Sequence, residues 1–178
     1  DGQEVTVRSK RGAIRLPAPA DPAAPLPAGV DVRVDGVEPF RVANADFYRV
    51  DTALVIPSVD VNGWRLRIRG LVDRPMELTY AELLARPLVE RVITLTCVSN
   101  QVGGKYAGTA TWLGVPLRDL LAEAGVQAGA DQIVSRSVDG MSIGTPTTVA
   151  MDGRDAMIAV GMNGAPLPPV HGFPARML

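Results

Sequence analysis

Residues 93–108 read ITLTCVSNQVGGKYAG and hold the only cysteine of the chain, Cys97. This cysteine stands where an apolar run breaks into a polar, glycine-rich loop. Val92, Ile93 and Leu95 are typical of the end of a buried strand, and the glycine pair that follows allows a backbone to approach a ligand closely. The stretch therefore predicts an ionisable sulfur at a strand end, able to bind a metal or act as a nucleophile. A lone cysteine in an apolar strand can also be an inert core residue.

The composition fits one globular domain. The chain has 178 residues, of which 47% are hydrophobic and 21% are charged, which is enough for a substantial core. A net charge of −1 argues against nucleic acid as a partner, because phosphate binding needs a basic face. No apolar run approaches the roughly 18 residues of a membrane span, and a single cysteine excludes an internal disulfide.

The first part of the chain differs from the rest. Residues 17–29 (PAPADPAAPLPAG) are too rich in proline for a helix or a sheet. We therefore expect residues 1–29 to be an arm or linker and residues 30–178 to be the domain. A basic cluster in this arm is typical of a solvated tail or of a segment beside a membrane: Arg8, Lys10, Arg11 and Arg15. Because the chain begins without methionine and stops at a hydrophobic Leu178, we expect a piece of a longer protein.

Four segments have the pattern of strands. Valines alternate with charged residues over 30–34, and apolar residues alternate with arginines over 64–68. Apolar runs over 89–98 and 133–138 predict two further strands. Two helices are predicted from residues at their ends. One follows the capping box of Thr79 and Glu82, and the other lies between Pro116 and Gly125.

A third helix is predicted to begin at Asp152 and to run through Met157 and Ile158, with a loop after Gly161. Strands and short helices mix without βαβ alternation or internal repeats. The predicted fold class is therefore α+β.

The only histidine, His171, stands between proline-rich backbone and a glycine, and Arg176 follows five residues later. Each can be an ordinary surface or core residue, but together they can hold an anion. A nucleophilic pair of Cys97 and His171 is also open, with Asn100 or Asn163 as the orienting group. A structural zinc site would need more Cys or His ligands than the chain has, and no P-loop or dinucleotide fingerprint is present.

Four segments occur in an order that is familiar: TLTCVSN (94–100), WLGVPLRDLL (112–121), MNGAPLP (162–168) and HGFPAR (171–176). Over residues 37–178 the chain resembles the molybdopterin-binding domain of the sulfite oxidase family. It is most similar to an actinobacterial branch in which this domain follows membrane helices. The resemblance implies a mixed-sheet α+β fold that is C-terminally incomplete here, because the family continues beyond the HGFPAR segment.

The resemblance also implies roles for individual residues. Cys97 would be the single protein ligand of molybdenum, which suits a soft thiolate. His171 and Arg176 would donate to the pterin and its phosphate. Further cofactor contacts are implied for the following residues: Asn44, Phe47, Tyr48, Arg49, Ser99, Asn100, Asp139 and Thr145. Asp139 and Thr145 can equally be turn residues, and we assign Trp112 and Met162 to packing.

Two positions depart from the family's pattern. Gln101 stands where sulfite oxidases have an arginine, with Lys105 as the nearest downstream cation, and Val50-Asp51 replaces an Asn-His pair. A less cationic pocket should bind sulfite or nitrate poorly, so no substrate is carried over from the family.

The predicted function is that of a molybdenum-cofactor oxidoreductase domain, with two-electron or oxygen-atom transfer on a small substrate. We expect a separate electron partner linked to haem or quinone, and a membrane-tethered parent protein on the extracytoplasmic face. The open alternatives are a thiol hydrolase or transferase that uses Cys97 and His171, and a binding module of the same fold without cofactor.

Overall fold

The computed structural model describes residues 14–32 and 34–178 of the chain. Most of the basic cluster of the arm (Arg8, Lys10 and Arg11) lies outside these residues. The main sheet has five strands: β3 (Val89–Thr96), β4 (Ala107–Pro116), β7 (Met157–Met162), β8 (Ala165–Pro166) and β9 (Arg176–Met177). Its order is β3-β4-β7-β8, and β9 also pairs with β7. These pairings are all antiparallel.

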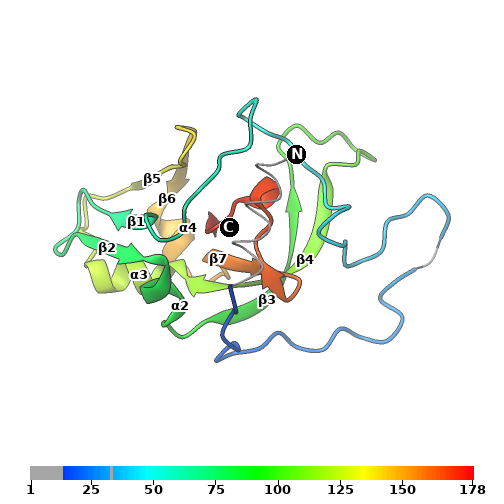
Figure 1. Ribbon diagram of the computed structural model, residues 1–178, viewed down its shortest axis with the longest axis horizontal. Coiled ribbons are helices and arrows are strands. Elements are labelled where there is room, and N and C mark those ends of the chain that lie inside the picture. Colours follow the sequence, from blue (N-terminus) through cyan, green and yellow to red (C-terminus); the bar gives the residue numbers. More distant parts are fainter. Residues whose placement is uncertain (1–13, 33) are drawn as a thin grey trace.

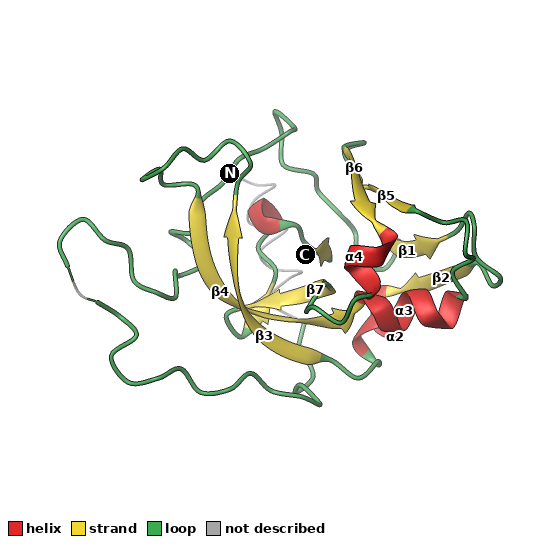
Figure 2. Ribbon diagram, turned by 180° about the vertical axis from the view of Figure 1, so that it is seen from behind, coloured by secondary structure: helices red, strands yellow, loops and turns green. Residues whose placement is uncertain are grey.

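Two separate hairpins complete the strands: β1 (Arg65–Ile68) with β2 (Met76–Thr79), and β5 (Gln132–Arg136) with β6 (Ser142–Pro146). The helices are α2 (Tyr80–Leu84), α3 (Leu117–Ala124), α4 (Thr147–Met151) and the 3-10 turn η1 (Pro169–His171). The long strands β3 and β4 lie at one end of the molecule, while α2, α3, α4 and both hairpins gather at the other (Figure 1, Figure 2). The predicted α+β class is confirmed.

Strand β4 is the centre of the sheet, and the sequence patterns gave no sign of it. It pairs with β3 along one edge and with β7 along the other, and residues 108–115 are all buried. A strand buried on both faces shows no alternation of apolar and polar residues. Gly114 is required there, because a Cβ atom would lie 2.4 Å from the carbonyl oxygen of Ile158 on β7.

The two helices predicted from their ends are confirmed. Thr79 caps α2 through its side chain, which accepts from the Glu82 amide, while the Glu82 carboxylate accepts from the Thr79 amide at 2.8 Å. Pro116 precedes α3 as its cap residue, and Gly125 ends it in the left-handed region at φ 71°. The buried face of α3 consists of Leu117, Leu120, Leu121 and Ala124.

Two predicted elements are wrong. Residues 157–162 form the buried strand β7, and Asp152 follows the end of α4 and binds Arg154. The apolar run MIAVGM fits a buried strand as well as a helix, and its position between β4 and β9 decides between them. The strand predicted over 30–34 is not seen in its described residues, 30–32 and 34, either. Val32 and Val34 are 70% and 54% exposed, and no strand in the described part of the chain pairs with them.

The loop predicted after Gly161 is also partly wrong. Strand β7 continues to Met162, turns at Asn163-Gly164 and pairs with β8. The strand predicted over 133–138 is confirmed as β5, which ends at Arg136 and pairs with the unpredicted β6.

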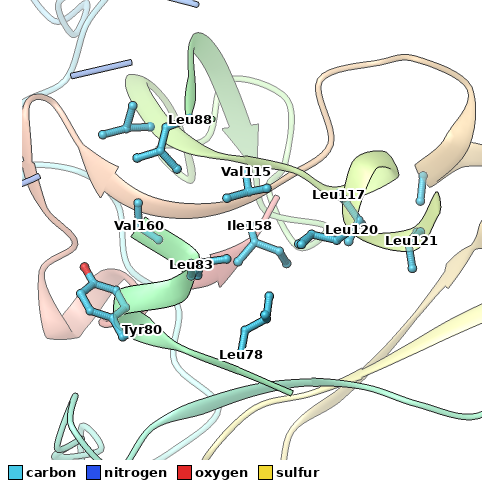
Figure 3. Close-up of a cluster of buried hydrophobic side chains, with 12 residues drawn as sticks. Leu78, Tyr80, Leu83, Leu88, Val115, Leu117, Leu120, Leu121, Ile158 and Val160 are labelled. Carbon is cyan, nitrogen blue, oxygen red and sulfur yellow. The ribbon is translucent and has the colours of Figure 1, made fainter. Parts of the chain in front are cut away.

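The core consists of two adjoining clusters. One lies between α2, α3, β2, β4 and β7, where Leu83, Leu120 and Val160 are fully buried (Figure 3). The other gathers around Trp112 and Met162, which are both fully buried, so their assignment to packing is confirmed.

The proline-rich arm runs along the free edge of β3. The amide of Ala20 donates to the Leu88 carbonyl at 2.8 Å, and Glu90 donates to the Asp21 carbonyl at 2.8 Å. Upstream of the prolines, Ile14 packs against both core clusters. Among the described residues, no helix is long and apolar enough to cross a membrane.

Candidate active site

Cys97 is the first residue after β3, at the start of the loop that leads to β4. Its amide donates to the Tyr106 carbonyl at 2.9 Å, which continues the ladder by one step. The side-chain oxygen of Asn100 accepts from the Tyr106 amide at 2.9 Å. A Cβ atom at Gly104 would lie 2.4 Å from this oxygen. The absence of a side chain at Gly104 therefore lets the Asn100 side chain pack inside the loop.

The thiol of Cys97 is half-buried, and its sulfur lies 3.1 Å from the Ser99 hydroxyl. The hydrogen bonds from the side chain and then the backbone of Ser99 lower the pKa of Cys97. A thiol of lowered pKa at an accessible loop is a metal ligand or a nucleophile.

Phe47 brings the early segment of the chain against this loop. Its buried ring packs against Tyr48, Trp112 and His171, with ring centroids 5.2, 5.8 and 5.5 Å away. Gly108 on β4 makes room for it, because a Cβ atom there would lie 2.8 Å from the Phe47 ring.

Tyr48 links the thiol to the far side of the site. Its ring lies 6.3 Å from that of Tyr106, beside Cys97. Burial raises the pKa of the Tyr48 phenol, the charge of Arg176 opposes this shift, and the charge of Cys97 adds to it. The phenol is therefore within electrostatic reach of both the thiol and the guanidinium.

His171 is buried, with Nε2 at 3.0 Å from the carbonyl oxygen of Asn44. Burial lowers the pKa of His171, the bond to Asn44 opposes this, and the nearby charges of Arg176 and Arg49 lower it further. The imidazole is thus neutral near pH 7.

Arg176 on β9 places its guanidinium over the Trp112 ring, 5.8 Å from the centroid. Burial lowers the pKa of Arg176, and the Tyr48 phenol is the one group that opposes this shift. Over residues 14–32 and 34–178, no carboxylate forms an ion pair with Arg176. A cation taken out of water without a counter-charge favours an anionic ligand.

The other predicted contacts lie further out. Arg49 is exposed and pairs with Asp51 at 2.5 Å. Asp139, in the turn of the β5–β6 hairpin, accepts from the Thr52 hydroxyl at 3.0 Å, which joins the hairpin to the segment after Arg49. Thr145 lies opposite Ile133 in this hairpin.

The structure also adds Tyr106 and Thr52 to the site, and it gives Asn163, a candidate orienting group of the Cys97–His171 pair, a different contact. Tyr106 and Thr52 connect predicted site residues, although no local signal marks them. Asn163 holds the Asn44 side chain at 2.8 Å. The dipeptide Asn163-Gly164 is the usual sequence of a two-residue hairpin turn, so a turn could have been predicted there.

A cavity of about 840 Å³ lies between residues 23–26 of the arm, residues 41–44, β3 and Asn163, and the predicted site residue Asn44 lines it. Neither Cys97 nor Arg176 lines it. The chemically suited groups therefore gather outside this cavity, around Tyr48.

The chain is similar to known proteins in sequence and in fold. Residues 53–178 match the family model described as the oxidoreductase molybdopterin binding domain. The chain belongs to this family. It is 34% identical over 150 residues to nitrate reductase (NADH) 1 of Oryza sativa subsp. japonica, covering 69% of this chain and 16% of that protein. It is 38% identical over 141 residues to nitrate reductase (NADH) of Volvox carteri, covering 64% of this chain and 16% of that protein.

The chain is also similar in structure to the sulfane dehydrogenase SoxCD from Paracoccus pantotrophus. The TM-score is 0.72 at 25% identity, over 80% of this chain and 40% of that one. The molybdopterin-binding fold expected from the sequence motifs is thereby confirmed. The chain spans less than half the length of these relatives.

The residues present fit the molybdenum cofactor of this family. Cys97 offers a soft thiolate, and Arg176 is a buried cation that lacks a counter-charge. No group of three His, Cys, Asp or Glu side chains in the described part of the chain is placed to hold a metal. A cofactor that brings its own metal ligands and an anionic phosphate matches such a donor set.

Proposed function

We propose that this domain works in a molybdenum-cofactor oxidoreductase, with Cys97 as the protein ligand of the metal. When bound, the cofactor supplies two-electron or oxygen-atom-transfer chemistry on a small substrate. The observation that carries the proposal is a row of packed rings (Tyr106, Tyr48, Phe47 and Trp112), with the Cys97 thiol beside its first ring and the buried Arg176 guanidinium over its last. These are the two ends of a ligand that is soft at one end and anionic at the other.

The remaining residues take supporting roles in this proposal. Arg176 would bind the phosphate, while Phe47, Tyr48 and His171 would line the pterin. Ser99 and Asn100 would hold the thiolate and its loop in place, through the contacts described above. Asn44 would act through its backbone, because both polar atoms of its side chain have partners. Arg49, Asp139 and Thr145 would form the outer rim.

The thiol hydrolase alternative has less support. Nε2 of His171 is committed to the Asn44 carbonyl, and no hydrogen bond joins His171 to Cys97 in residues 14–32 and 34–178. A Cys-His nucleophile needs the two side chains within hydrogen-bond reach.

The electron partner and the location are part of the proposal. Electrons would pass to or from a separate haem- or quinone-linked partner. A membrane-tethered parent protein on the extracytoplasmic face is supported by the resemblance to the actinobacterial branch.

The test is elemental and pterin analysis of the complete protein, made in a host that synthesises the cofactor. We expect about one molybdenum and one pterin per chain. Iodoacetamide should alkylate Cys97 in the cofactor-free protein, and cofactor loading should protect it. Absence of both molybdenum and pterin from correctly folded protein would refute the proposal, and a thiol-dependent hydrolysis would then favour the alternative.

Sulfite should be a poor substrate of the loaded protein. Gln101 and Lys105 are exposed in the Cys97 loop, and Arg49 is already paired with Asp51. We expect Gln101→Arg to raise kcat/KM for sulfite by about tenfold, the value of one charge-assisted hydrogen bond. Gln127→Arg, on the far side of α3, is the matched control and should change nothing. Rapid sulfite turnover by the unmodified protein would contradict this expectation.

A further inference from the structure

The turn between β7 and β8 carries a side chain that reaches across the sheet. Asn163 and Gly164 form a two-residue turn with φ values of 50° and 77°. The left-handed conformation at Asn163 is one that asparagine tolerates better than other side chains. From this turn, its amide makes three hydrogen bonds to two other parts of the chain.

The atoms of this network can be assigned without ambiguity. The oxygen of the Asn163 side chain accepts from the backbone amide of Thr111 at 3.0 Å, so its nitrogen must be the donor. That nitrogen donates to the Val42 carbonyl at 2.9 Å and to the side-chain oxygen of Asn44 at 2.8 Å. The nitrogen of Asn44 in turn donates to the Met162 carbonyl at 3.0 Å. Asn44 is thus fixed at both side-chain atoms.

The carbonyl of the same residue faces the histidine. Nε2 of His171 lies 3.0 Å from the Asn44 carbonyl oxygen, which can only accept. The proton of a neutral imidazole must then be on Nε2, and Nδ1 keeps its lone pair.

We infer that Asn163 is a positioning residue: it fixes Asn44, and through the Asn44 carbonyl it holds His171 as the Nε2–H tautomer with Nδ1 free to accept a hydrogen bond. In the cofactor site proposed above, His171 would accept a hydrogen bond from a ring N–H group, such as those of a pterin. Arg176 would then be the residue of the two that binds the anionic phosphate. This differs from the expectation that both side chains donate to the phosphate.

The groups around the ring favour the neutral form. The charges of Arg176 and Arg49 disfavour protonation of the second ring nitrogen of His171. The charge of Asp51 favours it. The edge of the ring meets Phe47, at an interplanar angle of 76°. A ring enclosed in this way has one strong polar partner, the Asn44 carbonyl.

The tautomer can be observed directly by nitrogen NMR of the complete protein labelled with ¹⁵N-histidine, with His171→Gln used to assign the signals. We expect Nε2 to carry the proton and Nδ1 to remain unprotonated at pH 8. Observation of the Nδ1–H tautomer in the unmodified protein would overturn the inference.

The role of Asn163 is tested by Asn163→Gly, because glycine accepts the left-handed turn and removes only the amide. We expect the ratio of the Nε2–H to the Nδ1–H form to fall about fivefold, the value of one hydrogen bond. The pKa of His171 should fall, because the bond to the Asn44 carbonyl raises it. Asn44→Ala, which leaves the turn intact, should give a change of the same sign. Asn62→Gly, on an exposed turn away from the site, is the matched control. An unchanged tautomer ratio in folded Asn163→Gly protein would refute the role of Asn163.

This inference rests on the proposed function only for the identity of the ligand. Loading with the cofactor should shift the Nδ1 signal and leave the proton on Nε2. If the protein takes up no molybdenum but keeps the Nε2–H tautomer, the proposed function fails and the positioning role stands. If the cofactor binds without shifting Nδ1, the assignment of Nδ1 as a cofactor acceptor is wrong.

Discussion

The variant Cys97→Ser should lose turnover by more than about a hundredfold while it keeps its fold. Removal of a residue that only supports a metal ligand already costs 10- to 100-fold, so loss of the ligand itself should cost more. The sulfur contacts the exposed Ser99 hydroxyl and lies outside both core clusters, so the free energy of unfolding should change little. The measurements are kcat with an artificial electron acceptor, molybdenum content and a urea unfolding curve.

The matched control for this variant is Ser99→Ala. It leaves the thiol in place and removes the hydroxyl that lowers the pKa of Cys97. Its loss of turnover should therefore be smaller than that of Cys97→Ser. Full turnover by Cys97→Ser protein that contains molybdenum would rule out the role of Cys97 as metal ligand.

The variant Arg176→Met should move stability and cofactor retention in opposite directions. In the cofactor-free protein, the guanidinium is buried over Trp112 without a carboxylate partner. A methionine of similar volume removes this desolvation cost, so the free energy of unfolding should rise by about 1 kcal/mol, net of the lost cation–π contact. Retention of the cofactor should fall about 10- to 100-fold, because charge-assisted hydrogen bonds to an anion are lost.

Urea unfolding of the cofactor-free protein and the rate of pterin loss from the loaded protein measure the two effects. Arg118→Met is the control, since Arg118 is exposed on α3 and pairs with Asp119. It should alter neither property. Equal retention of cofactor by Arg176→Met and the unmodified protein would show that Arg176 does not bind the anion.

Elements with signals at their own ends could be predicted from the sequence. The capping box at Thr79 and the Pro116–Gly125 pair located α2 and α3, because each signal depends on residues within one turn of the helix. Elements buried on both sides could not. The sequence AGTATWLGVP of β4 mixes small, polar and apolar residues that are all buried over 108–115, so its pattern did not indicate a strand. The apolar run of β7 was predicted as a helix, because such a run carries no period.

The site was predicted unevenly for a similar reason. Four ordered motifs pointed to Cys97, His171 and Arg176 and to the family, although these residues are up to 79 positions apart. The contacts of Asn163 with Asn44, across 119 positions, have no sequence signal. They exist only because β7 and β8 fold back beside the early segment.

The sequence by itself determined helices α2 and α3, the position of Cys97 after a strand and the family, since these depend on spacing along the chain. The tertiary structure decided that a row of packed rings runs between the thiol and the buried guanidinium, and that the Asn44 carbonyl fixes the histidine tautomer. Such relations depend on burial and on which groups meet across the sheet, and the free energy of a buried charge or hydrogen bond is set by those neighbours.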